Sequence, residues 1–133
     1  MIKQIAVFLE NKAGKASACC KILKEADVNL LALSIADTQD FGIMRLITEN
    51  NEKALSALKG AGYIASEVEL VGVEVPDKAG ALSELLIALG DGGVSVEYMY
   101  SYAGVDGQAK IALKTANPEK AIAALEKVGA KLI

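Results

Sequence analysis

The sequence repeats itself once, and this duplication limits the possible folds more than any other feature. Asn-Lys-Ala-Gly at 11–14 returns as Asp-Lys-Ala-Gly at 77–80, 66 positions later. Asn-Glu-Lys-Ala at 51–54 returns as Pro-Glu-Lys-Ala at 118–121, 67 positions later. Two copies, each the size of a small domain, predict a pair of similar domains rather than a solenoid. We expect the first domain at residues 1–66 and the second at 67–133.

Each copy carries the same series of strand and helix signals. The predicted strands are residues 2–9, 28–37, 43–48 and 63–65 in the first copy, and 68–75, 94–102, 109–115 and 130–133 in the second. One helix follows the first strand and another follows the third. Gly42 and the glycines at 104–107 are expected in the hairpin connections. The predicted fold class is α+β, with two ferredoxin-like βαββαβ units, each an antiparallel sheet with both helices on one face.

Apolar residues at helical spacing predict which helix faces are buried. The expected faces are Ala16, Cys19, Cys20, Leu23 and Ala26, then Leu82, Leu85, Leu86 and Leu89, then Ala54, Leu55 and Leu58, then Ala121, Ile122, Leu125 and Val128. Asn50 and Asn117 are suited to cap the second helix of each copy. No flexible linker separates the copies at Ser66-Glu67, which favours side-by-side packing.

Composition excludes several classes of function. The chain has no histidine, which removes His-based metal sites, general bases and nucleophile systems. Catalysis by lysines or carboxylates remains possible, but the commonest catalytic groups are missing, and we expect no metal, no cofactor and no catalytic residue. The net charge of −3 favours neither nucleic acid nor an anionic membrane as a partner. No apolar run is long enough to span a bilayer, no signal peptide is visible, and adjacent Cys19 and Cys20 indicate a reducing compartment, so we expect a cytoplasmic protein.

The loop between the first strand and first helix of each copy is the strongest candidate for a binding site. A helix N-terminus presents backbone N–H groups that attract an anion such as a carboxylate. Gly14 and Gly80 allow a ligand close to the backbone. Asp77 could bind an ammonium group, and Asn11 could accept or donate a hydrogen bond. The alternative is that Asn11 and Asp77 only cap their helices.

The strand, the Asn/Asp-Lys-Ala-Gly loop, the helix, and then Val-Asn or Val-Ser before the next strand together resemble the ACT domain family. The resemblance extends over essentially the whole chain, in two copies. It implies a non-enzymatic regulatory sensor of amino acids, with domains that pair through their second strands and a ligand at the domain interface. The implied ligand-binding residues are Asn11, Ala13, Gly14, Lys15, Asn29 and Leu30 in the first copy, and Asp77, Ala79, Gly80, Ala81, Ser95 and Val96 in the second.

Two alternative functions remain. One is a regulatory subunit that acts through contact with a partner metabolic enzyme; the other is an enzyme on a ferredoxin-like scaffold, which the fold alone does not exclude. Tyr98, Tyr100 and Tyr102 share one face of a predicted strand. This face could pack on the sheet or in an oligomer, or one of the tyrosines could line a ligand site. With 53% apolar residues, the chain is also expected to form a homodimer. The tyrosine face, on a strand expected near the centre of a double sheet, would anchor this homodimer.

Overall fold

The computed structural model describes residues 1–37 and 41–133, which divide into two compact units. The N-terminal unit is Lys3–Val68, and the C-terminal unit is Glu69–Ile133 together with Met1–Ile2. The division falls inside one strand, β4 (Ala65–Pro76), which contributes to both units. The predicted strands 63–65 and 68–75, expected to join directly through Ser66-Glu67, form one continuous strand that begins at Ala65.

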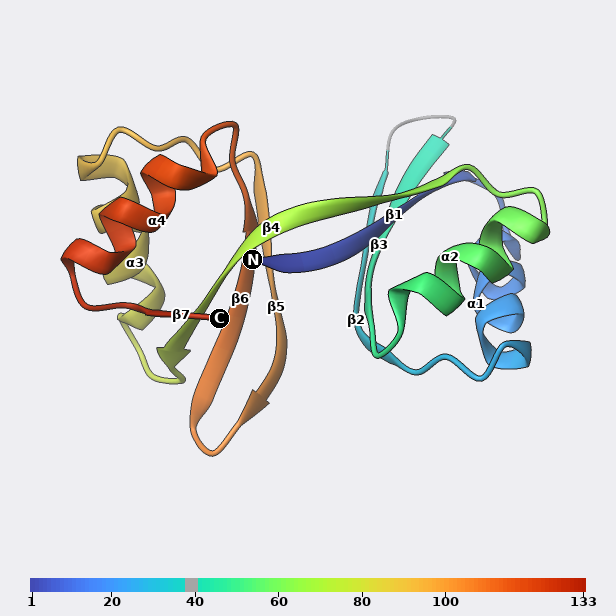
Figure 1. Cartoon of the computed structure of the whole chain (residues 1–133), viewed down its shortest axis with the longest axis horizontal. Coiled ribbons are helices and arrows are strands. Elements are labelled where there is room, and N and C mark those ends of the chain that lie inside the picture. The colour runs from blue at the N-terminus through green and yellow to red at the C-terminus, as the bar shows by residue number, and fades with distance from the viewer. Residues whose placement is uncertain (38–40) are drawn as a thin grey trace. The chain divides into compact units, whose positions relative to one another are not determined.

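The N-terminal unit has the order expected of a ferredoxin-like fold. Its elements are β1 (Ile2–Glu10), α1 (Lys15–Glu25), β2 (Leu30–Asp37), β3 (Phe41–Thr48), α2 (Asn51–Gly60) and the first part of β4. The strands are ordered β4-β1-β3-β2, and β3 is antiparallel to both of its neighbours. α1 and α2 pack against each other on one side of the sheet (Figure 1).

The C-terminal unit repeats this arrangement. Its elements are the second part of β4, α3 (Ala81–Asp91), β5 (Tyr98–Val105), β6 (Gln108–Lys114), α4 (Pro118–Lys127) and β7 (Lys131–Leu132). The order is β7-β4-β6-β5, with every pair antiparallel, and α3 packs on α4. The predicted pair of α+β, ferredoxin-like units is confirmed. In each unit the second strand, β2 or β5, is an outer strand of its sheet.

Each unit has its own apolar core between sheet and helices. The N-terminal core includes Ile5, Val7, Met44, Leu46, Cys19, Leu23, Ala54 and Leu58. The C-terminal core includes Val71, Val73, Ile111, Leu113, Leu85, Leu89, Ala121 and Leu125. Corresponding positions of the two copies are therefore buried in the same way, and five of these eight pairs carry the same residue. The hydrophobic effect thus selects the same strand and helix faces twice.

The buried face of α3 differs from the expected one. Leu85 and Leu89 are buried as predicted, but Leu82 and Leu86 are exposed, and Ala81 and Ala88 take their places in the interior. Periodicity gave the wrong answer because α3 is apolar on almost every side, so its sequence does not define a single face. In α4 the expectation is confirmed for Ala121 and Leu125, but Val128 is exposed.

Two expected helix caps are confirmed. The side chain of Asn50 accepts a hydrogen bond from the backbone N–H of Lys53, and that of Asn117 accepts one from Lys120, both at 3.1 Å. Two glycines lie elsewhere than expected. Gly104 is inside β5, and only Gly107 lies in the turn that follows it. Gly42 is inside β3, opposite Leu9, and not in the preceding hairpin connection. Glycine in a sequence usually indicates a turn. However, β3 pairs with β1 on one side and with β2 on the other, and such a strand tolerates a residue without a side chain.

Candidate functional site

The first loops of the two copies have the same backbone structure. The N–H of Lys12 donates to the Glu10 carbonyl at 2.9 Å, and the N–H of Lys78 donates to the Pro76 carbonyl at the same distance. The next bonds also match, because Lys15 and Ala81 each donate to the residue three positions earlier at 3.3 Å. The duplicated sequence motif therefore encodes one specific turn, built twice.

Each loop ends in a glycine with a left-handed backbone. Gly14 has φ 83° and Gly80 has φ 90°, a conformation that other residues adopt only with strain. These glycines are the N-caps of α1 and α3, and neither helix has a side-chain cap. The interpretation of Asn11 and Asp77 as helix caps is therefore wrong. The backbone N–H groups in the first turn of each helix therefore receive no hydrogen bond from a capping side chain, and they can attract a negative charge.

Charged side chains surround the first loop. Lys12 lies 3.2 Å from the Glu10 carboxylate. A hydrogen bond from Lys12, the charge of Lys12 and the charge of Lys15 all lower the pKa of the Glu10 carboxyl, which keeps it ionised. In the C-terminal unit, the backbone N–H of Asp77 donates to the Gly107 carbonyl at 2.8 Å, which holds that loop against the β5–β6 hairpin. Asn11, Ala13, Asp77 and Ala79 are all exposed.

The other predicted residues lie at the start of the second strands. The side-chain amide of Asn29 donates to the Glu49 carboxylate at 3.2 Å, and the backbone N–H of Glu49 donates to the Asn29 carbonyl. Asn29 and Ser95 are exposed, whereas Leu30 and Val96 pack against the cores of their units. Both copies therefore begin this segment with a polar, accessible residue followed by an anchored apolar one.

Within one unit, the loop and the start of the second strand lie at opposite ends of the sheet. Gly42 of β3 pairs with Leu9 at the loop end of β1 and with Asp37 at the far end of β2. Leu30, at the start of β2, instead pairs with Thr48 at the other end of β3. A single unit therefore does not bring the two halves of the predicted site together.

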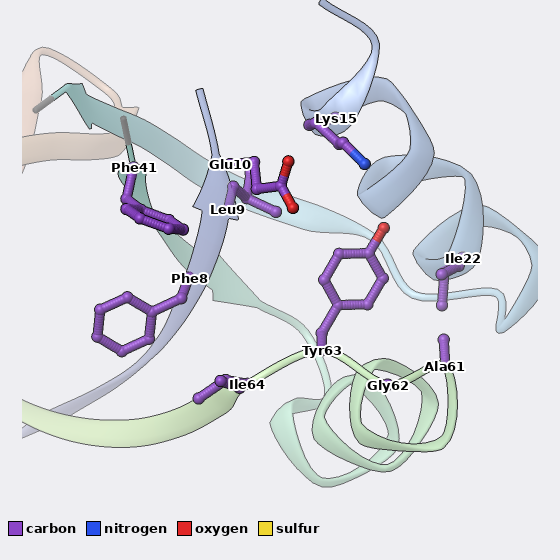
Figure 2. A pocket seen from close by; sticks show the side chains of 10 residues that line it. All are labelled: Phe8, Leu9, Glu10, Lys15, Ile22, Phe41, Ala61, Gly62, Tyr63 and Ile64. Atoms are coloured by element: carbon purple, nitrogen blue, oxygen red, sulfur yellow. The ribbon is translucent and has the colours of Figure 1, made fainter. Parts of the chain in front are cut away.

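A cavity of about 380 Å³ lies beside the first loop of the N-terminal unit. Figure 2 shows the residues that line it, which come from β1, α1, the start of β3 and the segment after α2: Phe8, Leu9, Glu10, Lys15, Ile22, Phe41, Ala61, Gly62, Tyr63 and Ile64. The Lys15 amino group and the Tyr63 hydroxyl point toward each other across the cavity, with the Glu10 carboxylate nearby (Figure 2). Burial, with a smaller effect of Cys19, raises the pKa of the Tyr63 hydroxyl.

The C-terminal unit has a cavity of about 440 Å³ at the corresponding place. Its walls are more charged, because Glu74, Lys78, Glu84 and Lys131 all contribute. Ala81 stands where the N-terminal unit has Lys15, and Ala130 stands where it has Tyr63. The two copies therefore share a cavity but differ in the groups that could contact a ligand.

Only two of the predicted site residues, Lys15 and Ala81, line these cavities, and Ala81 is itself buried in the core. Sequence reasoning missed the wall formed by Ala61, Gly62 and Tyr63. The available signal was Tyr63, a lone aromatic residue directly after the glycine that follows α2. Its distance of 48 positions from Lys15 hides their proximity until the fold is known.

Other kinds of site are not seen in the part of the chain that the structure describes. Across residues 1–37 and 41–133, no group of three or more acidic or cysteine side chains could hold a metal ion. Cys19 is buried, Cys20 is partly buried, and both are free thiols, as expected. None of the described helices has the length and apolar character needed to cross a membrane.

Two ferredoxin-like units in tandem, each with the same first loop, define a class of tandem small α+β domains. The family of ACT domain pairs matches residues 1–129, and the chain belongs to this family. ACT domain pairs are regulatory, so the chain is a regulatory module. No curated protein matches it.

Solved structures agree with this family. Protein BT0572 from Bacteroides thetaiotaomicron is 36% identical, with a TM-score of 0.91, over 99% of this chain and 91% of that chain. The ligand-free regulatory subunit of aspartate kinase from Thermus thermophilus is 18% identical, with a TM-score of 0.69, over 96% and 90%. The corresponding subunit from Thermus flavus is 15% identical, with a TM-score of 0.65, over 96% and 92%. The last two likenesses concern the fold alone.

Proposed function

We propose that this ACT domain pair is a non-enzymatic sensor that binds a free amino acid where two ACT units meet. The observation that carries the proposal is the duplicated first loop, with a left-handed glycine and no side-chain cap at Gly14 and again at Gly80. Backbone N–H groups at such a helix start suit the α-carboxylate of an amino acid. Asn11 or Asp77 would then contact the polar end of the ligand.

The geometry of a single unit supports the proposal that two units contribute to the site. The first loop and the start of the second strand are at opposite ends of each sheet, so Asn29 or Ser95 must reach a loop that belongs to another unit. A ligand that binds between two units stabilises the state in which these units are in contact. Binding would therefore shift a conformational or assembly equilibrium, which is how a regulatory module acts on a partner. We expect this to occur in the cytoplasm.

Calorimetry of the full chain with each of the twenty amino acids tests this proposal. At least one amino acid should bind and should also raise the unfolding temperature, because a ligand specific for the folded state stabilises it. Asp77→Ala or Asn11→Ala should weaken binding by roughly 1–3 kcal/mol if the lost group contacts a charged part of the ligand. Asn117→Ala is the matched control, because Asn117 caps α4 and belongs to neither loop. Unchanged affinity in both loop variants would reject the proposed site.

A second candidate function is a regulatory subunit that acts through protein contact. The observation that favours it is the outer strand β2, on which Leu31, Leu33 and Ile35 are between 40% and 48% exposed. Exposed apolar rows of this kind often mark interaction sites. The Thermus aspartate kinase regulatory subunits share the fold, so an enzyme of amino-acid metabolism is the partner to test. Capture of such an enzyme without added ligand, lost in Leu33→Ser, would favour this function over ligand sensing.

A further inference from the structure

We infer that the cavity of the N-terminal unit is a binding site of its own, for a small carboxylate with an aromatic or branched apolar body. It lies wholly within Lys3–Val68 and does not depend on an interface between units. Its volume of about 380 Å³ is within the range of small-molecule sites. The inference shares Lys15 with the predicted interface site, but it does not rest on that site and needs no second unit.

The positive charge at the cavity comes from Lys15. Lys15 takes part in none of the ion pairs found among the described residues, whereas the neighbouring Lys12 lies 3.2 Å from Glu10. Its amino group points into the cavity, toward the Tyr63 hydroxyl (Figure 2). An ammonium and a phenol hydroxyl facing each other provide two hydrogen-bond donors for one carboxylate.

The rest of the cavity is mainly apolar. Ile22 of α1 and Ala61 after α2 face each other at one end, and Leu9, Tyr63 and Ile64 extend the wall (Figure 2). An aromatic or branched group can bury apolar area here while its carboxylate stays near Lys15. The Glu10 carboxylate, kept ionised by nearby lysines, is placed to favour a ligand that also carries an ammonium group.

The C-terminal cavity lacks this combination. Lys131 lies 3.0 Å from the Glu74 carboxylate, so these two charges satisfy each other. Ala81 and Ala130 remove the amino group and the hydroxyl that Lys15 and Tyr63 supply in the other unit. We therefore expect one site of this kind per chain, with the N-terminal unit as its location.

Titration of the full chain with 3-phenylpropanoate, L-phenylalanine and 2-phenylethylamine tests the inference. Both carboxylates should bind with one molecule per chain at concentrations up to about 10 mM, and the amine should not bind. Lys15→Met should weaken carboxylate binding by about tenfold or more, because it removes the charge but keeps the chain length. Lys78→Met, which removes a lysine from the wall of the C-terminal cavity, should leave the affinity unchanged.

Ala61→Leu provides a second test. Ala61 is exposed and faces Ile22 across the cavity, so a larger side chain fills the space without disturbing the core. This variant should fold normally by circular dichroism and lose binding of both carboxylates. Asp77→Ala, which alters the proposed interface site, should keep it. Absence of carboxylate binding to the wild-type chain, equal effects of Lys15→Met and Lys78→Met, or unaltered binding in Ala61→Leu would each overturn the inference.

Discussion

Lys131 Nζ lies 3.0 Å from the Glu74 carboxylate, across the pair of strands formed by β7 and β4. The Glu74 side chain is only 16% exposed, whereas that of Lys131 is 71% exposed. The pair thus neutralises a largely covered carboxylate with a lysine that remains in contact with water. The corresponding residues of the N-terminal unit, Phe8 and Ile64, are apolar.

A double-mutant cycle with Glu74→Gln and Lys131→Met should give a coupling energy of about 0.5–1 kcal/mol at low salt. The value is modest because one partner is exposed, and it should fall as salt screens the charges. Urea unfolding of the four proteins at two salt concentrations measures it. A coupling energy near zero at low salt would show that the ion pair does not contribute to stability.

The helix caps give a prediction about the free energy of unfolding. Asn117→Ala should destabilise the chain by about 1 kcal/mol, because the N–H of Lys120 loses its partner at the start of α4. Asp77→Ala should change the stability by less than about 0.5 kcal/mol, since Asp77 is exposed and caps no helix. Chemical denaturation of both variants decides the point. Equal losses would mean that Asp77 supports the fold as well.

A close approach at Gly72 predicts a large effect from a single methyl group. A Cβ at this position would lie 2.6 Å from Ile2 Cγ1 and 2.9 Å from Ile133 Cγ1. Gly72→Ala should therefore destabilise the chain by roughly 1–3 kcal/mol through overpacking. Gly60→Ala, at the end of α2 with open space around it, is the control and should be neutral or slightly stabilising. A neutral Gly72→Ala would show that Ile2 and Ile133 move aside at little cost.

Cys19 predicts how stability depends on alkaline pH. Burial, with a smaller effect of Cys20, raises the pKa of the Cys19 thiol from 9.0 to about 11. The folded state therefore favours the neutral thiol, and this contribution is complete below pH 9 and lost as the pH rises from 9 toward 11. Unfolding free energies at several pH values should show wild type losing its advantage over Cys19→Ala across this range. Parallel curves for the two proteins would contradict this prediction.

The tyrosine row predicts an oligomer. Tyr98, Tyr100 and Tyr102 pair with Lys114, Ala112 and Lys110, and they therefore share the sheet face that points away from the helices. β5 is an outer strand of its unit, not the central strand of a double sheet that we expected. Light scattering at micromolar concentration should give the mass of a homodimer, reduced in Tyr100→Ser. A monomer would reject the oligomer, and a dimer unaffected by Tyr100→Ser would reject the row as its anchor.

The duplicated sequence was sufficient to predict the order of strands and helices, because hydrophobic spacing and cap residues act locally. The caps at Asn50 and Asn117 and the buried positions Leu23 and Leu58 follow from such local rules. The orientation of α3 did not follow, because Leu82, Leu85, Leu86 and Leu89 are equally apolar and only the sheet beneath selects among them.

The cavity in the N-terminal unit was beyond sequence reasoning for a different reason. Lys15 belongs to α1, and Tyr63 belongs to the segment that follows α2. These two parts of the chain line the same cavity only once the whole unit has folded. The first loop could be identified from the repeat, but its capping had to be read from the backbone. A glycine at φ 83° takes the cap position and displaces Asn11 from that role.

The continuity of β4 limits how this protein can be divided. A fragment cut at residues 66 and 67 would take the strand out of one sheet or leave an overhang on the other. A fragment that begins at Glu69 would also lack Ile2, whose side chain packs close to Gly72. Neither copy is thus a separable module, and shuffling a single copy into another protein would require redesign of the strand that both copies use.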